Sequence, residues 1–137
     1  MPKDLVFLAM IESGGVASAK SPVGARGLWQ FMAPTAREYG LSSNERLDPE
    51  TSTDAALTYL AKLHDRFGSW YLAAAAYNTG EANGARSIAR NKAAGKPTDF
   101  FGGYQCPPSG VDTASPCVAG PGGVVFQPAL IDFVATI

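Results

Sequence analysis

Residues 47–68 constrain the fold more strongly than any other stretch of the sequence. They read LDPETSTDAALTYLAKLHDRFG, which places Asp48 at a helix N-cap and Pro49 at the first helical position. Apolar side chains then recur with the i, i+4, i+7, i+11 spacing of a single helix face. They are Ala56, Leu60, Leu63 and Phe67. The stretch therefore predicts a long amphipathic helix whose apolar face packs against a core.

The segment that follows, SWYLAAAAYNTG at residues 69–80, is apolar on every face and predicts a helix at the centre of the fold. Further helices are expected from PKDLVFLAMIES, APTAREYG, EANGARSIARN and FQPALIDFVATI, at residues 2–13, 33–40, 81–91 and 126–137. The first of these is apolar almost all round, so we expect it to be buried. No alternating apolar and polar run of useful length is present, so we predict a mainly α fold with little or no β structure.

The whole chain has the length and composition of a single globular domain, residues 1–137. With 46% hydrophobic residues among 137, it can bury a core. Gly- and Pro-rich loops are expected between the helices, above all a variable loop at 92–123. Eleven Lys and Arg against 12 Asp and Glu leave a net charge of -1 without a basic block, so no nucleic-acid partner is expected.

The apolar runs of the sequence are too short for a membrane span. The longest, Leu5 to Ile11 and Trp70 to Tyr77, fall well short of the roughly 20 residues that cross a bilayer. No charged leader with a cleavage site opens the chain, so secretion would use a signal absent from it, or the chain is a fragment.

Metal and thiol chemistry have few candidate residues. One histidine, His64, and two cysteines do not suffice for a usual zinc site with about four ligands, so neither a metal nor another cofactor is expected. Cys106 and Cys117 share the Pro-, Gly- and Ser-rich stretch YQCPPSGVDTASPCVAG. A disulfide between them would indicate an oxidising compartment, and two free thiols are the alternative.

Glu12 is an acid at the inner end of an apolar helix. An ionised carboxylate there loses solvation unless it is paired or neutral, although an acid at a helix end is more often a solvated cap. Two further stretches stand out together with ES at 12–13, namely GLWQFM at 27–32 and AAYNTGE at 75–81. Taken singly, each is explained by helix capping or core packing.

In this order and at these spacings, the three stretches resemble the catalytic domain of the soluble lytic transglycosylases, which are peptidoglycan-cleaving enzymes with a lysozyme-like fold. The similarity is greatest to the membrane-bound lytic transglycosylase D type and runs almost continuously over residues 2–90. It includes the turns RLDP and FGSW, each of which enters a helix. The resemblance implies peptidoglycan glycan strands as the partner, in the cell envelope, the periplasm or outside the cell. We also expect a monomer.

By the same resemblance, Glu12 is the catalytic acid and base, and Ser13 supports it. The residues that the resemblance places around the sugar groove are Gln30, Met32, Tyr77, Asn78 and Phe126. Phe126 stands where the family has a tyrosine near the closing helix, so this fourth motif departs from the pattern. The alternatives are a structural hydrogen-bonding role for Gln30 and a packing role for Phe126.

The expected chemistry needs only one protein carboxylate. Glycosidases usually use two, but Glu12 is the only convincing internal acid near these motifs. One suffices if the N-acetyl oxygen of N-acetylmuramic acid attacks its own anomeric carbon. Glu12 would protonate the glycosidic oxygen and then accept the proton of the C6 hydroxyl, which closes a 1,6-anhydro ring. For the first step, apolar surroundings should raise the pKa of Glu12.

Two other functions stay open at this point. A lysozyme-type hydrolase would use a second carboxylate, for which Glu81 is the leading candidate. A non-catalytic glycan-binding module would agree with Phe126 and with Gly15 to Ala17, which replace the Phe-Asn-Pro of many family members. Product mass distinguishes the two enzymes, because a 1,6-anhydro end is lighter than a reducing end by one water.

Overall fold

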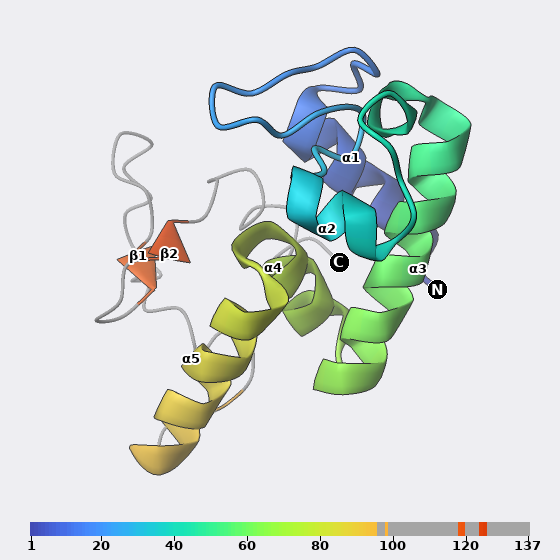
Figure 1. Cartoon of the computed structure of the whole chain (residues 1–137). Coiled ribbons are helices and arrows are strands. Elements are labelled where there is room, and N and C mark those ends of the chain that lie inside the picture. The colour runs from blue at the N-terminus through green and yellow to red at the C-terminus, as the bar shows by residue number, and fades with distance from the viewer. Residues whose placement is uncertain (96–97, 99–117, 120–123, 126–137) are drawn as a thin grey trace. The chain divides into compact units, whose positions relative to one another are not determined.

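The computed structural model describes residues 1–95, 98, 118–119 and 124–125, and within them the fold is mainly helical (Figure 1). The α-helices are α1 (Val6–Ser13), α2 (Ala33–Glu38), α3 (Pro49–Phe67), α4 (Trp70–Thr79) and α5 (Glu81–Ala93). Two short 3-10 helices, η1 (Lys3–Leu5) and η2 (Glu45–Leu47), precede α1 and α3. Strands β1 (Val118–Ala119) and β2 (Val124–Val125) pair antiparallel. The predicted fold class, mainly α with little β structure, is confirmed.

The chain divides into two compact units, residues 1–62 and residues 63–137, with the boundary inside α3. The prediction of one domain over 1–137 stays a prediction. The predicted closing helix at 126–137 and most of the variable loop at 92–123 lie outside the described residues. Among the helices that are described, none combines the length and the apolar character needed to span a membrane.

The long helix α3 begins where the sequence predicted. The Asp48 carboxylate accepts hydrogen bonds from the backbone N–H of Thr51 at 2.8 Å and from the Thr51 hydroxyl at 2.5 Å. The first of these bonds satisfies a donor that the opening turn of a helix otherwise leaves unpaired. Three residues of the predicted apolar face are fully buried, namely Ala56, Leu60 and Leu63.

Helix α1 buries one face rather than its whole surface. The buried residues of this segment are Leu5, Leu8 and Ala9. The exposed apolar residues are Val6, Phe7 and Met10, with exposed fractions of 57%, 52% and 53%. The prediction of a helix buried all round was therefore wrong. At about 3.6 residues per turn, positions 5, 8 and 9 share one side of the helix, and only that side packs into the core.

The second unit is built on α4, whose predicted central position is confirmed by the burial of four consecutive residues, Ala73 to Ala76. Gly80 ends α4 and leads directly into α5. At Gly84 of α5, a Cβ would lie 3.2 Å from the Ala76 Cβ and 3.4 Å from the Phe67 ring. The two helices therefore approach each other closely, and small residues on both of them permit that approach.

Candidate active site

Glu12 and Ser13 lie in the last turn of α1, and both are half-buried. The Ser13 hydroxyl donates its proton to the Ala9 carbonyl one turn earlier, at 3.0 Å. Toward Glu12 or a ligand, Ser13 can therefore offer only the lone pairs of its oxygen. At the C-terminal end of a helix, the last carbonyl groups point along the helix axis and carry the negative end of the helix dipole. This end therefore favours the neutral form of an acid over its anion.

The loop at 14–32 follows α1 in the first unit (Figure 1). Backbone pairing holds this loop in place. Arg26 and Phe31 exchange two backbone hydrogen bonds, with N···O distances of 3.1 and 3.0 Å. Arg26 also forms an antiparallel bridge with Lys20. Exchanged pairs of this kind are those of an antiparallel ladder, so they give the loop a fixed path between α1 and α2.

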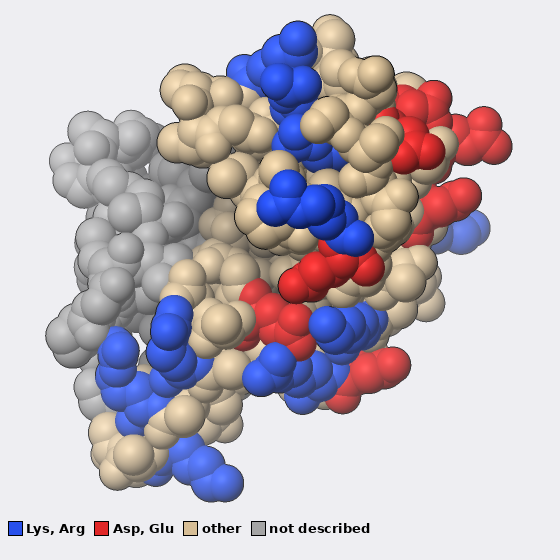
Figure 2. Space-filling view, viewed as in Figure 1, with Lys and Arg blue, Asp and Glu red and all other residues tan. Residues whose placement is uncertain are grey.

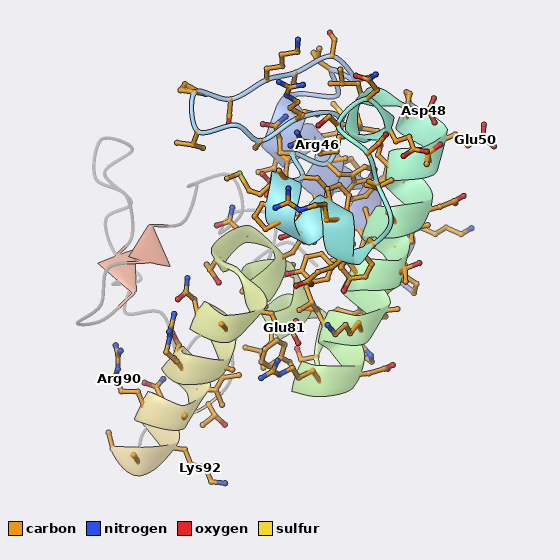
Figure 3. All side chains as sticks on the ribbon, in the orientation of Figure 1. Arg46, Asp48, Glu50, Glu81, Arg90 and Lys92 are labelled. Carbon is orange, nitrogen blue, oxygen red and sulfur yellow. The ribbon has the colours of Figure 1, made fainter. Side chains whose placement is uncertain are left out.

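Arg46 supports this loop (Figure 3). Arg46 is only 5% exposed, and one guanidinium nitrogen donates to the carbonyls of Gly24 at 3.1 Å and Phe31 at 3.0 Å. Gly27 packs against the backbone of the same arginine. Its φ is 85°, and a Cβ there would lie 1.7 Å from the Arg46 carbonyl oxygen. The RLDP motif pointed to a turn, whereas the support that Arg46 gives to the loop was missed.

Two pKa values in the first unit reflect these contacts. Burial lowers the pKa of Arg46, and the like charges of Arg26 and Arg37 lower it further. A guanidinium stays protonated in proteins, so Arg46 remains a cation beside the loop. The hydroxyl and the backbone N–H of Thr51 lower the pKa of Asp48, because both bonds favour the ionised carboxylate.

Gln30 has a structural role in the loop. Its φ is 50°, and its side-chain amide donates to the carbonyls of Gly27 at 2.8 Å and Ala19 at 3.3 Å. Both amide protons are used within the loop, so only the side-chain oxygen can meet a donor on a sugar. The structural hydrogen bonds that the sequence left open are therefore present. Met32, the other predicted groove residue of this segment, is 42% exposed and accessible to a ligand.

Tyr77 and Asn78 lie in the last turn of α4 in the second unit, and both are half-buried. The side-chain amide of Asn83 donates to the Thr79 carbonyl at 2.8 Å, which ties the start of α5 to the end of α4. Because Tyr77 and Asn78 belong to one unit and Glu12 to the other, their approach to the acid stays a prediction.

Three predicted positions lie outside the described residues, namely Cys106, Cys117 and Phe126. The disulfide and the fourth motif therefore stay predictions. Within the described ranges, no group of three His, Cys, Asp or Glu side chains is placed to hold a metal ion.

Glu81, the leading candidate for a second carboxylate, has a structural partner. Its Oε1 lies 2.5 Å from Nη1 of Arg66, so the ion pair joins the first turn of α5 to the end of α3 within the second unit (Figure 3). An acid in the first turn of a helix also meets the positive end of the helix dipole. These two interactions explain Glu81 without a catalytic role and leave Glu12 as the candidate acid.

Sequence comparison relates most of the chain to known proteins, beginning with a family model described as Transglycosylase SLT domain, which matches residues 1–100. The membrane-bound lytic murein transglycosylase D of Escherichia coli strain K12 is 42% identical over 106 residues, which are 74% of this chain and 24% of that protein. The membrane-bound lytic murein transglycosylase F 2 of Alkalilimnicola ehrlichii is 39% identical over 101 residues, 66% of this chain and 22% of that protein. The peptidoglycan transglycosylase gp16 of Escherichia phage T7 is 41% identical over 80 residues, 54% of this chain and 6% of that protein. The chain thus spans less than a quarter of each of these three proteins.

Proposed function

The chain belongs to the transglycosylase SLT domain family, and we propose that it is a peptidoglycan lytic transglycosylase. It would cleave the β-1,4 bond between N-acetylmuramic acid and N-acetylglucosamine and leave a 1,6-anhydromuramic end. The observation that carries the proposal is the position of Glu12, a half-buried acid at the end of α1 that leads directly into a paired loop. The names of two relatives as lytic murein transglycosylases support the same substrate.

Glu12 acts first as an acid and then as a base. It donates its proton to the glycosidic oxygen while the N-acetyl oxygen of the muramic sugar attacks the anomeric carbon, and the bond to the leaving sugar breaks. The ionised Glu12 then accepts the proton of the C6 hydroxyl. The C6 oxygen displaces the N-acetyl oxygen and closes the 1,6-anhydro ring. Glu12 ends the cycle protonated, as it began.

The first step requires Glu12 to be protonated near neutral pH. Two features of α1 support that state. Glu12 is half-buried, and partial loss of solvation disfavours a carboxylate anion. The position of Glu12 at the C-terminal end of the helix disfavours the anion as well.

The remaining residues of the site would position the sugar. The Gln30 side-chain oxygen would accept a hydrogen bond from a hydroxyl or from the acetamido N–H, because its own amide protons are used in the loop. Met32 would offer an exposed apolar surface to a sugar ring. Tyr77 and Asn78 carry the donors and acceptors that suit the N-acetyl group.

We further propose that the protein acts as a monomer where peptidoglycan lies, in the cell envelope, the periplasm or outside the cell. Sedimentation of the purified protein tests whether it is a monomer. A Cys106–Cys117 disulfide would accompany an oxidising compartment, and titration of free thiols in the unreduced, unfolded protein measures it. Two reactive thiols would rule the bridge out.

The variant Glu12→Gln tests the assignment, with Glu81→Gln as the matched control. Loss of a general acid and base lowers a rate by at least about 100-fold, so Glu12→Gln should stop measurable digestion of sacculi while remaining folded by circular dichroism. Glu81→Gln removes the charge that pairs with Arg66 and should still digest them. Inactivity of Glu81→Gln would favour a lysozyme-type hydrolase. Binding of sacculi by the wild type without turnover would favour a glycan-binding module.

A further inference from the structure

The segment after α1 carries positive charge with no acid to balance it. Residues 14–37 contain Lys20, Arg26 and Arg37 and no Asp or Glu, and Arg46 packs against the same loop. Figure 2 shows Lys and Arg atoms over the loop at the top of the view, whereas Asp and Glu atoms at that height gather on the right, over the start of α3.

None of these four cations forms an ion pair with a carboxylate of the described residues. Arg46 directs its guanidinium to two backbone carbonyls, which satisfy hydrogen bonds without neutralising the charge. Burial lowers the pKa of Arg46 most, and the like charges of Arg26 and Arg37 lower it further. No carboxylate acts in the opposite direction. The backbone of Arg26 and the guanidinium of Arg46 meet at the Phe31 carbonyl, and among the described residues no carboxylate neutralises this cluster of three arginines.

Acids close to this cluster in the sequence are directed elsewhere. The carboxylate of Glu45, which adjoins Arg46, accepts a hydrogen bond from the Ser42 backbone N–H at 2.7 Å. Asp48 accepts its hydrogen bonds from Thr51, and Figure 3 shows Asp48 and Glu50 pointing away from Arg46. Glu38 adjoins Arg37 in α2, but successive residues of a helix point about 100° apart and do not face each other. Among the residues that the structure describes, these acids therefore leave the arginines available to an external anion.

Arg26 and Arg37 are the accessible members of the cluster, since Arg26 is half-buried and Arg37 is exposed. The backbone pairing with Phe31 fixes the position from which the Arg26 side chain extends. A guanidinium presents its N–H groups in a planar fork that matches the two oxygens of a carboxylate. The chemistry of the cluster thus suits one or two carboxylate groups.

We propose that Arg26 and Arg37 bind carboxylates of the stem peptide of peptidoglycan, so that the domain prefers glycan strands whose stem peptides carry free carboxylates over strands whose stem peptides are amidated. The inference rests on the proposed function, because the sugar backbone itself supplies no anion where the lactyl group of muramic acid is joined to a peptide. The stem peptide supplies carboxylates beside the sugar whose bond is cleaved. Arg46 acts as a positioning residue that supports the loop, and Lys20 adds to the positive field.

Binding of a muramyl tripeptide tests the charge recognition directly. Calorimetry would compare the peptide with free carboxylates and the same peptide with amidated carboxylates, using the Glu12→Gln protein at low and high salt. The free acid should bind about three- to tenfold more tightly, and the difference should shrink with ionic strength because exposed charges are screened. Equal affinity for the two peptides would overturn the inference. Displacement of the free acid by equimolar inorganic phosphate would also overturn it, because the site would then bind any anion.

Two variants locate the recognition. The double variant Arg26→Gln with Arg37→Gln should lose the difference between the two peptides, after thermal unfolding has shown that it is folded. Arg86→Gln is the matched control, because it removes an exposed arginine of α5 that contacts Asn83 and lies outside the cluster. A double variant that keeps the preference, or an Arg86→Gln protein that loses it, would overturn the assignment to Arg26 and Arg37.

Turnover separates this inference from the proposed function. The wild type should cleave sacculi with free stem-peptide carboxylates with a kcat/KM about three- to tenfold above that for sacculi whose stem-peptide carboxylates have been amidated. Cleavage of both substrates at one rate would overturn the preference and leave the transglycosylase function standing. Cleavage of neither substrate, with the difference in peptide binding intact, would overturn the proposed function and leave the carboxylate site standing.

Discussion

The loop at 14–32 and the helix pair α4 and α5 are held in place by different kinds of contact. In the loop, a few directional contacts carry the structure: the guanidinium of Arg46 on two carbonyls, the amide of Gln30 on two more, and the close approach at Gly27. Between α4 and α5, one side-chain hydrogen bond, from Asn83 to the Thr79 carbonyl, accompanies small side chains such as Ala76 and Gly84 that pack in many weak contacts. Loss of one directional contact in the loop should therefore matter more than loss of one packing contact.

This difference bears on the site. The candidate acid and two predicted groove residues lie on or beside the loop. We therefore expect the residues that hold the loop to influence the site, including Gly27 and Arg46, for which no substrate contact is proposed. Substitutions at Gly27, Arg46 and Gln30 should therefore change stability and activity together.

Gly27→Ala should have the largest effect on stability. The new Cβ would lie 1.7 Å from the Arg46 carbonyl oxygen, and the φ of 85° disfavours a side chain in any case. We expect the free energy of unfolding to fall by about 3 kcal/mol or more, because a backbone clash adds to conformational strain. Denaturant unfolding measures the change.

Two control variants sharpen this result. Gly24→Ala places a Cβ in open space at a φ of 92°, so it should show only the conformational loss of about 1–2 kcal/mol. Gly84→Ala in the second unit meets Ala76 at 3.2 Å but gains helix propensity, so it should stay within about 1 kcal/mol of the wild type. A Gly27→Ala protein no less stable than Gly24→Ala would remove the basis for the comparison.

Arg46→Met should have the next largest effect. It removes the guanidinium donor from the carbonyls of Gly24 and Phe31, of which Phe31 keeps the bond from the Arg26 backbone N–H. We expect a loss of about 2–4 kcal/mol, since each hydrogen bond from a charged group contributes about 1.5–3 kcal/mol and relief of like-charge repulsion offsets part of it. Arg46→Lys keeps the charge without the planar fork, so its free energy of unfolding should lie between those of the wild type and Arg46→Met. Wild-type stability of Arg46→Met in thermal unfolding would show that the guanidinium does not hold the loop.

Gln30→Glu distinguishes a structural residue from a residue that only contacts sugar. The carboxylate has the shape of the amide but no protons for the carbonyls of Gly27 and Ala19. The free energy of unfolding should fall by about 1–3 kcal/mol, because two bonds are lost and lone pairs face each other. Digestion of sacculi should fall as well. Lower activity at unchanged stability would restrict Gln30 to substrate binding.

Asp48→Asn should have the smallest effect on stability, and only at acidic pH. Hydrogen bonds from Thr51 lower the folded-state pKa of Asp48. Its contribution to stability is therefore complete above the unfolded value of about 4 and is lost as pH falls through the lower folded value. Asn is an equally good N-cap, so the variant should match the wild type near neutral pH and lose stability less steeply below about pH 4. Parallel urea-unfolding profiles down to about pH 2 would contradict the role of this carboxylate.

Local signals predicted the helices well because each helix end is decided by nearby residues. Asp48 caps α3 through a bond to Thr51, three residues away, and Gly80 ends α4 at the predicted position. The burial of α1 was predicted less well. Because this helix is apolar on almost every side, its sequence does not indicate which side packs against the core. Phe7 is 52% exposed.

The support of the site could not be predicted in the same way. Arg46 and Gly24 are 22 residues apart, and Gly27 packs against the backbone of the same distant residue, Arg46. A local sequence pattern therefore predicts neither contact. The chemical type of Gln30 suits both a sugar and a backbone carbonyl. Only the observed bonds decide that its amide protons are used in the loop.

One acid, Glu12, is proposed to act with the N-acetyl group of the substrate in place of a second carboxylate. The mass of the products released from sacculi tests it most directly. The wild type should release fragments with 1,6-anhydromuramic ends, one water lighter than reducing-end fragments, and the Glu12→Gln protein should release none. Reducing-end fragments from the wild type would contradict the account, because they would require a water molecule activated by another group, such as Glu81.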